Sequence, residues 1–267
     1  MKKIISVALV VVLSLAMTMA FGGCKSGGST DSGSAGSSAS SSGDAYELYT
    51  AANKKVQDAE GFSATTDLTM GLSIGGQSMD IQSTGDIICS KVSDSDIQLK
   101  MDQEMTISGA AIQLESYYKD GYMYTSMMGM KTKVKTPLEQ AMAAGQNPNF
   151  KKEDIKDSTV VSGDDGNTVL NFTITGDGLK DVVMQNMPST VTSGASAGDF
   201  TFTDAKIVAT IDKDGNIISS EMNTTFTMDV MGQKIDSSMD IKTANIKTGA
   251  QAITYPTDLD TYTEAAA

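Results

Sequence analysis

Apolar and polar side chains alternate along most of this chain after residue 61. Between residues 62 and 74 the apolar side chains hold even positions, and polar residues such as Thr65 and Asp67 hold odd ones. A period of two predicts a strand with one face toward a core and the other toward water. Glycine-containing turns separate successive runs of this kind, at Gly75-Gly76, Gly109-Ala110 and Asp120-Gly121. Alternating runs joined by tight turns predict antiparallel hairpins.

The same pattern recurs often enough to predict about ten or eleven strands. They lie near residues 62–74, 77–89, 97–107, 112–118, 122–124, 157–163, 167–175, 200–212, 216–230 and 234–247. Helical spacing replaces alternation in three places. These are residues 44–60, with Asp44 as candidate N-cap and Gly61 as stop, residues 137–145, and residues 179–187.

Strands this long, each with one apolar face, predict a single large sheet. The fold class is therefore mainly β (α+β), a curved antiparallel sheet or half-barrel with an N-terminal helix and two inserted helices. Burial of one large apolar side chain is worth about 1.5–3 kcal/mol, and a bare apolar face of this size would cause aggregation. We expect the three helices to cover the concave face.

The amino terminus predicts export. Lys2 and Lys3 precede an apolar run from Ile4 to Ala20, which reads as a secretory signal because it is short for a span and ends in small residues. Phe21-Gly22-Gly23-Cys24 resembles the lipobox of bacterial lipoproteins, although Phe21 replaces the usual leucine. The resemblance implies cleavage after residue 23 and acylation of Cys24, with palmitate among the expected chains. An ordinary signal peptide followed by a chance cysteine is the alternative.

Residues 24–43 predict a tether. After Cys24 they are almost entirely Gly, Ser, Ala and Thr, which carry no side chain large enough to pack. Nineteen such residues would have a root-mean-square reach of roughly 25 Å. We therefore expect a signal peptide over residues 1–23, a lipidated cysteine and linker over 24–43, and one folded domain over 44–263.

Charge narrows the choice of partners. The chain has 20 basic and 33 acidic residues, a net charge of −13, and neither arginine nor histidine. Nucleic-acid binding requires clustered Lys and Arg, so we expect none. The expected partners are the membrane, through acylated Cys24, and a hydrophobic small ligand. We expect a monomer.

The chain offers few groups for catalysis. Without histidine it can build neither a Ser-His-Asp triad nor a His-ligated metal site, so we expect no enzyme activity, no cofactor and no metal. Cys89 continues an alternating apolar series and is predicted to be a buried small hydrophobe. Residues 212–216 (Asp-Lys-Asp-Gly-Asn) look like part of a calcium loop, but the glycine and glutamate positions do not fit, so a hairpin turn is favoured.

A helix followed by a large antiparallel sheet with inserted helices, behind a lipobox and tether, resembles the LolA/LppX-like lipoprotein superfamily. It is also similar to lipoproteins of Gram-positive bacteria that share that fold. Residues 116–124 (Ser-Tyr-Tyr-Lys-Asp-Gly-Tyr-Met-Tyr) match an aromatic hairpin of those proteins. Their hairpin usually continues into a Trp-Lys step, and Met130-Lys131 stands there in this chain. The resemblance covers about residues 44–263 and implies a cavity between sheet and helices that holds acyl chains.

The abundance of methionine fits such a cavity. Fifteen of the 18 methionines follow the signal, and flexible Met side chains can repack around varied ligands, although they can equally fill an ordinary core. The candidate ligand-binding residues are Met70, Leu72, Met79, Ile81, Leu99, Met101, Met105, Leu114, Tyr118, Met142, Met184, Met222, Phe226 and Met239. The alternative is an envelope interaction or sensor module whose interior is filled by its own side chains.

Overall fold

The computed structural model of the chain describes residues 44–93, 96–138, 141, 150–186, 200–230 and 232–264. The signal, lipobox and linker expected over residues 1–43 therefore lie outside the described residues. None of the described helices has the length and apolarity needed to cross a membrane.

The described residues form one 13-stranded curved sheet with helices α2 (Ala45–Asp58) and α4 (Gly176–Asn186). The first six strands are β1 (Gly61–Ile74), β2 (Gln77–Ser93), β3 (Asp96–Ile107), β4 (Ala110–Lys119), β5 (Tyr122–Met127) and β6 (Met130–Lys135). The remaining strands are β7 (Ile155–Ser162), β8 (Thr168–Ile174), β9 (Phe200–Phe202), β10 (Ala205–Ile211), β11 (Ile217–Val230), β12 (Gln233–Thr248) and β13 (Thr263–Glu264).

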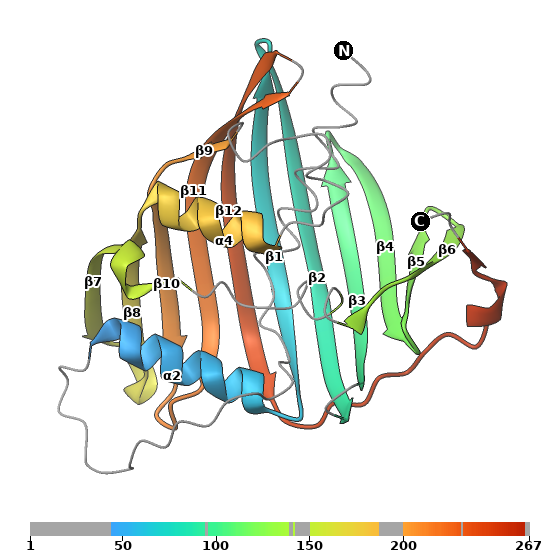
Figure 1. Cartoon of the computed structure of the whole chain (residues 1–267), viewed down its shortest axis with the longest axis horizontal. Helices are drawn as coiled ribbons and strands as arrows, with labels where there is room; N and C mark the ends of the chain where they lie inside the picture. The colour runs from blue at the N-terminus through green and yellow to red at the C-terminus, as the bar shows by residue number, and fades with distance from the viewer. Residues whose placement is uncertain are drawn as a thin grey trace.

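The strand order places an early strand beside a late one in the middle of the sheet. It runs β13-β6-β5-β4-β3-β2-β1-β12-β11-β10-β8-β7, and β9 pairs with β11 (Figure 1). Most neighbours in this order are joined by hairpins, but β1 and β12 are far apart in sequence and pair antiparallel in the middle of the sheet. The pair β13 and β6 is parallel, so the expectation of a purely antiparallel sheet is wrong at this edge.

The expected mainly β fold is confirmed, and the strand count rises from about ten or eleven to thirteen. Three short strands account for the difference. Strand β6 was not expected, and β13 is only two residues long. The strand expected over residues 200–212 is interrupted at residues 203–204, which makes β9 and β10 separate strands. Short strands carry too few alternating positions to be recognised from the pattern.

Helix α2 begins where the sequence predicts. The Asp44 carboxylate accepts a hydrogen bond from the Tyr46 backbone N–H at 3.0 Å, which caps the helix. The helix ends at Asp58 rather than at Gly61, which instead begins β1. A β-carbon at Gly61 would lie 2.5 Å from the Cys89 carbonyl oxygen, so this close strand contact requires glycine.

The two described helices lie on the same side of the sheet (Figure 1). Helix α2 packs against β7, β8 and β11, and its Tyr49 ring meets Phe172 of β8 edge-on at 5.4 Å. Helix α4 packs against β9. The helix expected over residues 137–145 lies mostly outside the described residues; Leu138 and Ala141 are helical.

Residues 250–262, named here the strap, carry the chain from β12 in the middle of the sheet to the edge at β6 (Figure 1). The Tyr255 hydroxyl donates to the Tyr118 carbonyl oxygen at 3.0 Å, and Lys131 forms an ion pair with Asp258. The Tyr262 ring is 3% exposed and contacts Tyr124 at 5.5 Å. The strap contains a single 3-10 turn, Leu259–Thr261.

Candidate functional site

Cross-strand register defines one apolar face of the sheet, here called the inner face. Met70 of β1 lies opposite both Met239 of β12 and Ile81 of β2. Directly opposed residues of antiparallel strands point to the same side, so these three side chains share a face. The Tyr49–Phe172 contact shows that this is the side on which α2 lies, because Phe172 pairs with inner-face Ile207.

The register extends the inner face across most of the sheet. Every candidate ligand-binding residue with a described side chain lies on it, namely Met70, Leu72, Met79, Ile81, Leu99, Met101, Met105, Leu114, Tyr118, Met222, Phe226 and Met239. Met142 is outside the described residues, and the side chain of Met184 is not described. Their shared face was predictable from alternation; their role in binding stays a prediction.

Burial on the inner face extends from the centre of the sheet to β4 and is lost at the β5 edge. Met70 and Met239 are 0% exposed, whereas Met101 of β3 and Leu114 of β4 are 8% and 9% exposed. Met127 of β5, which pairs with Leu114, is 37% exposed. Leu99, Met105 and Tyr118 of β3 and β4 are 2%, 3% and 2% exposed, so the apolar face is buried over most of β1 to β4 and opens at β5 and β6.

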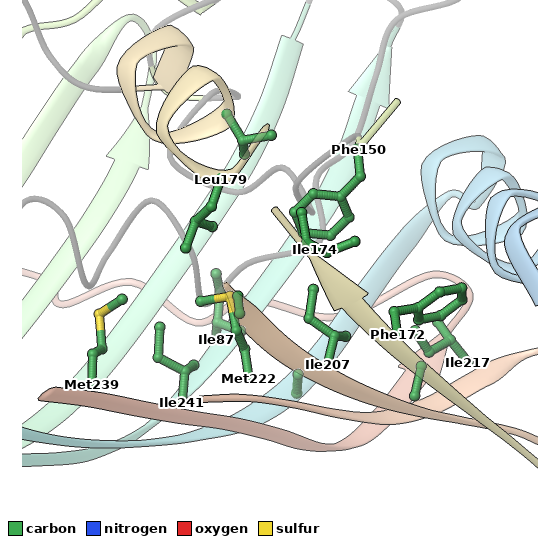
Figure 2. Close-up of a cluster of buried hydrophobic side chains, with 14 of the residues drawn as sticks. Ile87, Phe150, Phe172, Ile174, Leu179, Ile207, Ile217, Met222, Met239 and Ile241 are labelled. Atoms are coloured by element: carbon green, nitrogen blue, oxygen red, sulfur yellow. The ribbon is translucent and has the colours of Figure 1, made fainter. Parts of the chain in front are cut away.

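The helices cover the other half of this face. Both helices cross in front of β8, β10, β11 and β12 in Figure 1, and β3 to β6 lie to one side of them. Figure 2 shows Ile207, Met222 and Ile241 rising from the strands toward Leu179 of α4. Leu179 is 0% exposed, so this half has the packing of an ordinary core.

A few hydroxyl groups interrupt the apolar lining. Ser83, Ser116 and Ser237 are buried and lie on the inner face by register. The Ser237 hydroxyl, 5% exposed and next to Phe226 across the strands, has no hydrogen-bond partner among the described residues. A buried polar group without a partner costs about 1–3 kcal/mol, so this hydroxyl is a candidate to bind a polar ligand atom.

Sequence reasoning missed several inner-face residues. Ile107 and Ile112 pair with Ile81 and Met105 respectively, and both are partly buried. Met123 pairs with Tyr118 in the same way. Alternation along β3 to β5 places them on this face, so the sequence pattern was a sufficient signal to include them.

Four tyrosines are concentrated in the β4–β5 hairpin. Burial raises the pKa of Tyr118, whose hydroxyl donates to the Thr136 carbonyl oxygen at 3.3 Å. Tyr117 points to the outer face, where its ring lies 6.0 Å from that of Tyr255. Burial, followed by the charges of Glu115 and Asp102, raises the pKa of Tyr117 to about 12. Both hydroxyls therefore stay protonated at neutral pH and serve as packing and hydrogen-bonding groups.

The other candidate sites from the sequence, the carboxylate turn at residues 212–216 and Cys89, have structural roles. Within the described part of the chain, no group of three or more His, Cys, Asp or Glu residues could hold a metal ion. Asp212 accepts hydrogen bonds from the Asp214 and Asn216 backbone N–H groups at 2.9 and 2.8 Å, which makes this segment the predicted turn, between β10 and β11. Cys89 is buried, as its alternation predicts.

One surface hollow lies on the opposite, outer face. It has a volume of about 370 Å³ and is lined chiefly by small polar side chains of β1, β2, β11 and β12, among them Ser73, Ser78, Asp80, Asp236 and Ser238. Gly71 also lines it, and a β-carbon there would lie 2.9 Å from the Ser238 hydroxyl oxygen. Its lining also includes Leu72, Phe226 and Ser237 of the inner face, but the side chains that give it its polar character belong to the outer face.

Comparison with known proteins identifies a matching family but no activity. The model of a family of unknown function, DUF6612, matches residues 44–257. No curated protein matches the chain significantly.

Several solved structures are distantly similar. LprF from Mycobacterium bovis is 14% identical, with 82% of this chain and 98% of that chain covered and a TM-score of 0.39. A DUF1329 family protein from Desulfovibrio piger is 10% identical, with 78% and 93% covered and a TM-score of 0.26. A putative outer membrane lipoprotein-sorting protein domain from Vibrio parahaemolyticus is 11% identical, with 81% and 96% covered and a TM-score of 0.23.

Proposed function

Because the chain belongs to DUF6612, a family of unknown function, we propose its role from its own geometry: it is a lipid-anchored, extracytoplasmic binding protein without enzymatic activity. Its ligand is an acyl chain or another elongated apolar molecule. The ligand lies on the inner face of the sheet, beside the half that α2 and α4 cover.

One observation carries this proposal. The apolar inner face continues over β3, β4 and β5, beyond the strands on which the described helices pack. Along these strands Ile107, Ile112 and Met123 are only partly buried. Accessible apolar area beside a packed core can bind an apolar ligand, since its burial stabilises the complex by about 25 cal/mol per Å².

The composition of the face supports an acyl ligand. Binding sites for small apolar molecules combine an apolar lining with a few polar groups that fix orientation. Met101 and Met105 supply flexible apolar contacts, and the buried Ser116 hydroxyl, opposite Met101, supplies a hydrogen-bonding group. A lipid headgroup oxygen or a carboxyl group at one end of the ligand would complete this arrangement.

The anchor is argued from sequence. Phe21-Gly22-Gly23-Cys24 places a cysteine directly after two small residues at the end of an apolar signal-like run. Acylation there would hold the domain at the outer surface of the membrane, where lipids are available as ligands.

A second candidate function rests on the sealed centre of the inner face. Met70, Met239 and Ile235 are each 0% exposed, which means that no empty space adjoins them. A chain whose interior is filled throughout would act as an interaction or sensor module of the envelope. The two candidates differ in whether an apolar molecule accompanies the protein.

Native mass spectrometry of the protein purified under mild conditions separates them. The binding protein should carry extra mass that corresponds to a lipid, and organic extraction should release it. Protein that binds no lipid, whether as purified or after incubation with lipid, would favour the interaction module.

A matched pair of variants then locates the ligand. Ile112→Trp adds bulk on the inner face of β4, and Gln113→Trp adds the same bulk on the exposed outer face. Fluorescence of N-phenyl-1-naphthylamine, which rises in apolar surroundings, should fall at least severalfold with the Ile112 variant and stay unchanged with the Gln113 variant. Equal signals from the two variants would place the ligand elsewhere.

A further inference from the structure

Exposed apolar side chains concentrate in one hairpin. Six large apolar residues are exposed in the described part of the chain, and four of them belong to the β5–β6 hairpin: Met127 (37%), Met128 in the turn (73%), Met130 (60%) and Val134 (37%). The other two, Val92 and Val161, lie apart on β2 and β7. Single exposed apolar residues are ordinary, but a cluster on one hairpin indicates an interaction surface.

The turn of this hairpin places a methionine in a left-handed backbone conformation that favours glycine, asparagine or aspartate. Met128 and Gly129 have φ values of 50° and 80°, so both central residues are left-handed. The chain makes the same two-residue turn at Gly75-Gly76, Ser108-Gly109 and Asp120-Gly121, with residues suited to that geometry. A left-handed methionine costs about 1–2 kcal/mol, and such strain with no packing gain is found at functional sites.

The hairpin is basic, whereas the chain as a whole is acidic. The net charge is −13, yet residues 122–135 contain Lys131, Lys133 and Lys135 and no acidic residue. The strap supplies the acidic neighbours, since Asp258 pairs with Lys131 and Glu264 lies opposite Lys133 in the parallel ladder. The three lysines share the outer face of the ribbon, opposite Met127, Met130 and Val134.

The methionines are continuous with the inner face. Met130 lies opposite Met127, and Met127 lies opposite Leu114, so one row of apolar side chains connects the exposed turn to the proposed binding face. A surface that covered the turn would therefore touch the open end of that face.

We infer that the β5–β6 hairpin docks on an anionic lipid bilayer, with Met127, Met128 and Met130 entering the headgroup region and Lys133 and Lys135 facing the phosphates. This inference rests on the proposed function and adds to it the place where ligand passes between membrane and protein. Lysine and tyrosine beside an apolar tip suit the membrane interface, because their long side chains keep polar ends in water. Each lysine near an anionic surface strengthens binding severalfold.

The proposed anchor permits this contact. Helix α2 begins at the far side of the sheet from the hairpin (Figure 1). Neighbouring strands lie about 4.8 Å apart, so the eleven strands from β6 to β7 span about 48 Å. The 19 residues between Cys24 and Asp44 can extend to about 65 Å, which is enough to let the hairpin reach the bilayer.

Vesicle binding tests the inference with a chain that begins at residue 25. All described strands and helices lie within residues 44–264, so this chain keeps every described contact. It should sediment with phosphatidylcholine vesicles that contain about one quarter phosphatidylglycerol, and much less with phosphatidylcholine alone. Joint substitution Met127→Ser, Met128→Ser and Met130→Ser should lower binding at least tenfold. Val92→Ser with Val161→Ser, which removes equally exposed apolar groups elsewhere, should leave it unchanged.

Fluorescent labels locate the contact. In the chain from residue 25 the remaining cysteine, Cys89, is buried, so a single Met128→Cys substitution can carry an environment-sensitive label. Its emission should shift to the blue with anionic vesicles, and a label at Val161→Cys should not respond. Equal binding by wild type and the serine variant would overturn the inference. So would a dimer that the serine substitutions dissolve while vesicles bind neither form.

The outcome is separable from that of the proposed function. If lipid co-purifies but the hairpin binds no vesicles, the docking surface is wrong and the ligand site stands. If vesicle binding depends on the methionines but no lipid co-purifies, the docking surface stands and the proposed ligand site is wrong.

Discussion

Met70 of β1 and Met239 of β12 lie directly opposite each other, and both side chains are 0% exposed. They occupy the centre of the inner face, between the half covered by α2 and α4 and the half that opens toward β5. Their packing decides how far an apolar ligand can extend across the sheet.

Truncation of Met239 tests whether this centre is solid. Met239→Ala should lower the free energy of unfolding by about 2–5 kcal/mol, because removal of a fully buried side chain leaves a cavity. Urea unfolding measures the loss. Ser238→Ala, one residue away on the exposed outer face, should change stability by less than about 0.5 kcal/mol. A cost below about 1 kcal/mol at Met239 would mean that space already exists there.

Close contact between β2 and β3 makes Gly85 sensitive to substitution. A β-carbon at Gly85 would lie 2.3 Å from the Asp102 carbonyl oxygen, so Gly85→Ala should cost about 1–3 kcal/mol or more as the strands separate. Gly71→Ala is the matched control, because its β-carbon would meet only the movable Ser238 hydroxyl at 2.9 Å. The control should be neutral in urea unfolding. Equal losses at both positions would contradict the close contact.

Cys24 is predicted to carry the anchor. Cells grown with a labelled palmitate should incorporate label into the wild-type protein and none into Cys24→Ser. The variant should leave the membrane fraction, and its domain should unfold at the same urea concentration as wild type, since the substitution lies outside residues 44–264. Label retained by the variant would place the acyl group elsewhere.

Stability at high pH should depend on Tyr117. Its pKa is about 12 in the folded chain against an ordinary value of 10, so the folded state holds a proton that the unfolded state has lost. This contribution is complete below pH 10 and disappears as the pH rises toward 12. Urea unfolding across that range should show a steeper loss for wild type than for Tyr117→Phe. Parallel curves would show that the hydroxyl is solvated.

Met128 should show a conflict between stability and membrane binding. Met128→Asn relieves an unfavourable left-handed methionine and should raise the free energy of unfolding by up to about 1 kcal/mol, while it weakens vesicle binding. Met130→Asn removes similar apolar area without backbone relief, so it should weaken binding and leave stability unchanged. A Met128 variant with neither effect would show that the turn is not strained.

Much of the fold follows from local pattern. The alternation over residues 62–74 predicted β1 almost to the residue, and glycines placed most of the turns. Strand β6 was missed because four of its six residues, Lys131, Thr132, Lys133 and Lys135, are polar. The break between β9 and β10 does leave a signal: buried residues occupy even positions at Phe200 and Phe202 and odd ones from Ala205 onward.

The candidate site was predictable only in part. Register follows from alternation, so membership of the inner face could be assigned for residues such as Met101 and Leu114. The decline of burial toward β5 could not, because it depends on which strands α2 covers after folding. The exposure of Met127, Met128 and Met130 depends in the same way on the hairpin's place at the sheet edge.

The position of β12 between β1 and β11 governs when this protein can fold. Strands β1 to β6 form one series of hairpins, β7 to β11 form a second group, and the two meet only through β12. Contacts between residues about 170 positions apart in the sequence form late, because closing a loop of that length lowers chain entropy before the packing energy compensates for the loss. Until residue 248 has been synthesised the sheet stays in two parts. That delay would keep the emerging chain loose enough to be threaded through a secretion channel.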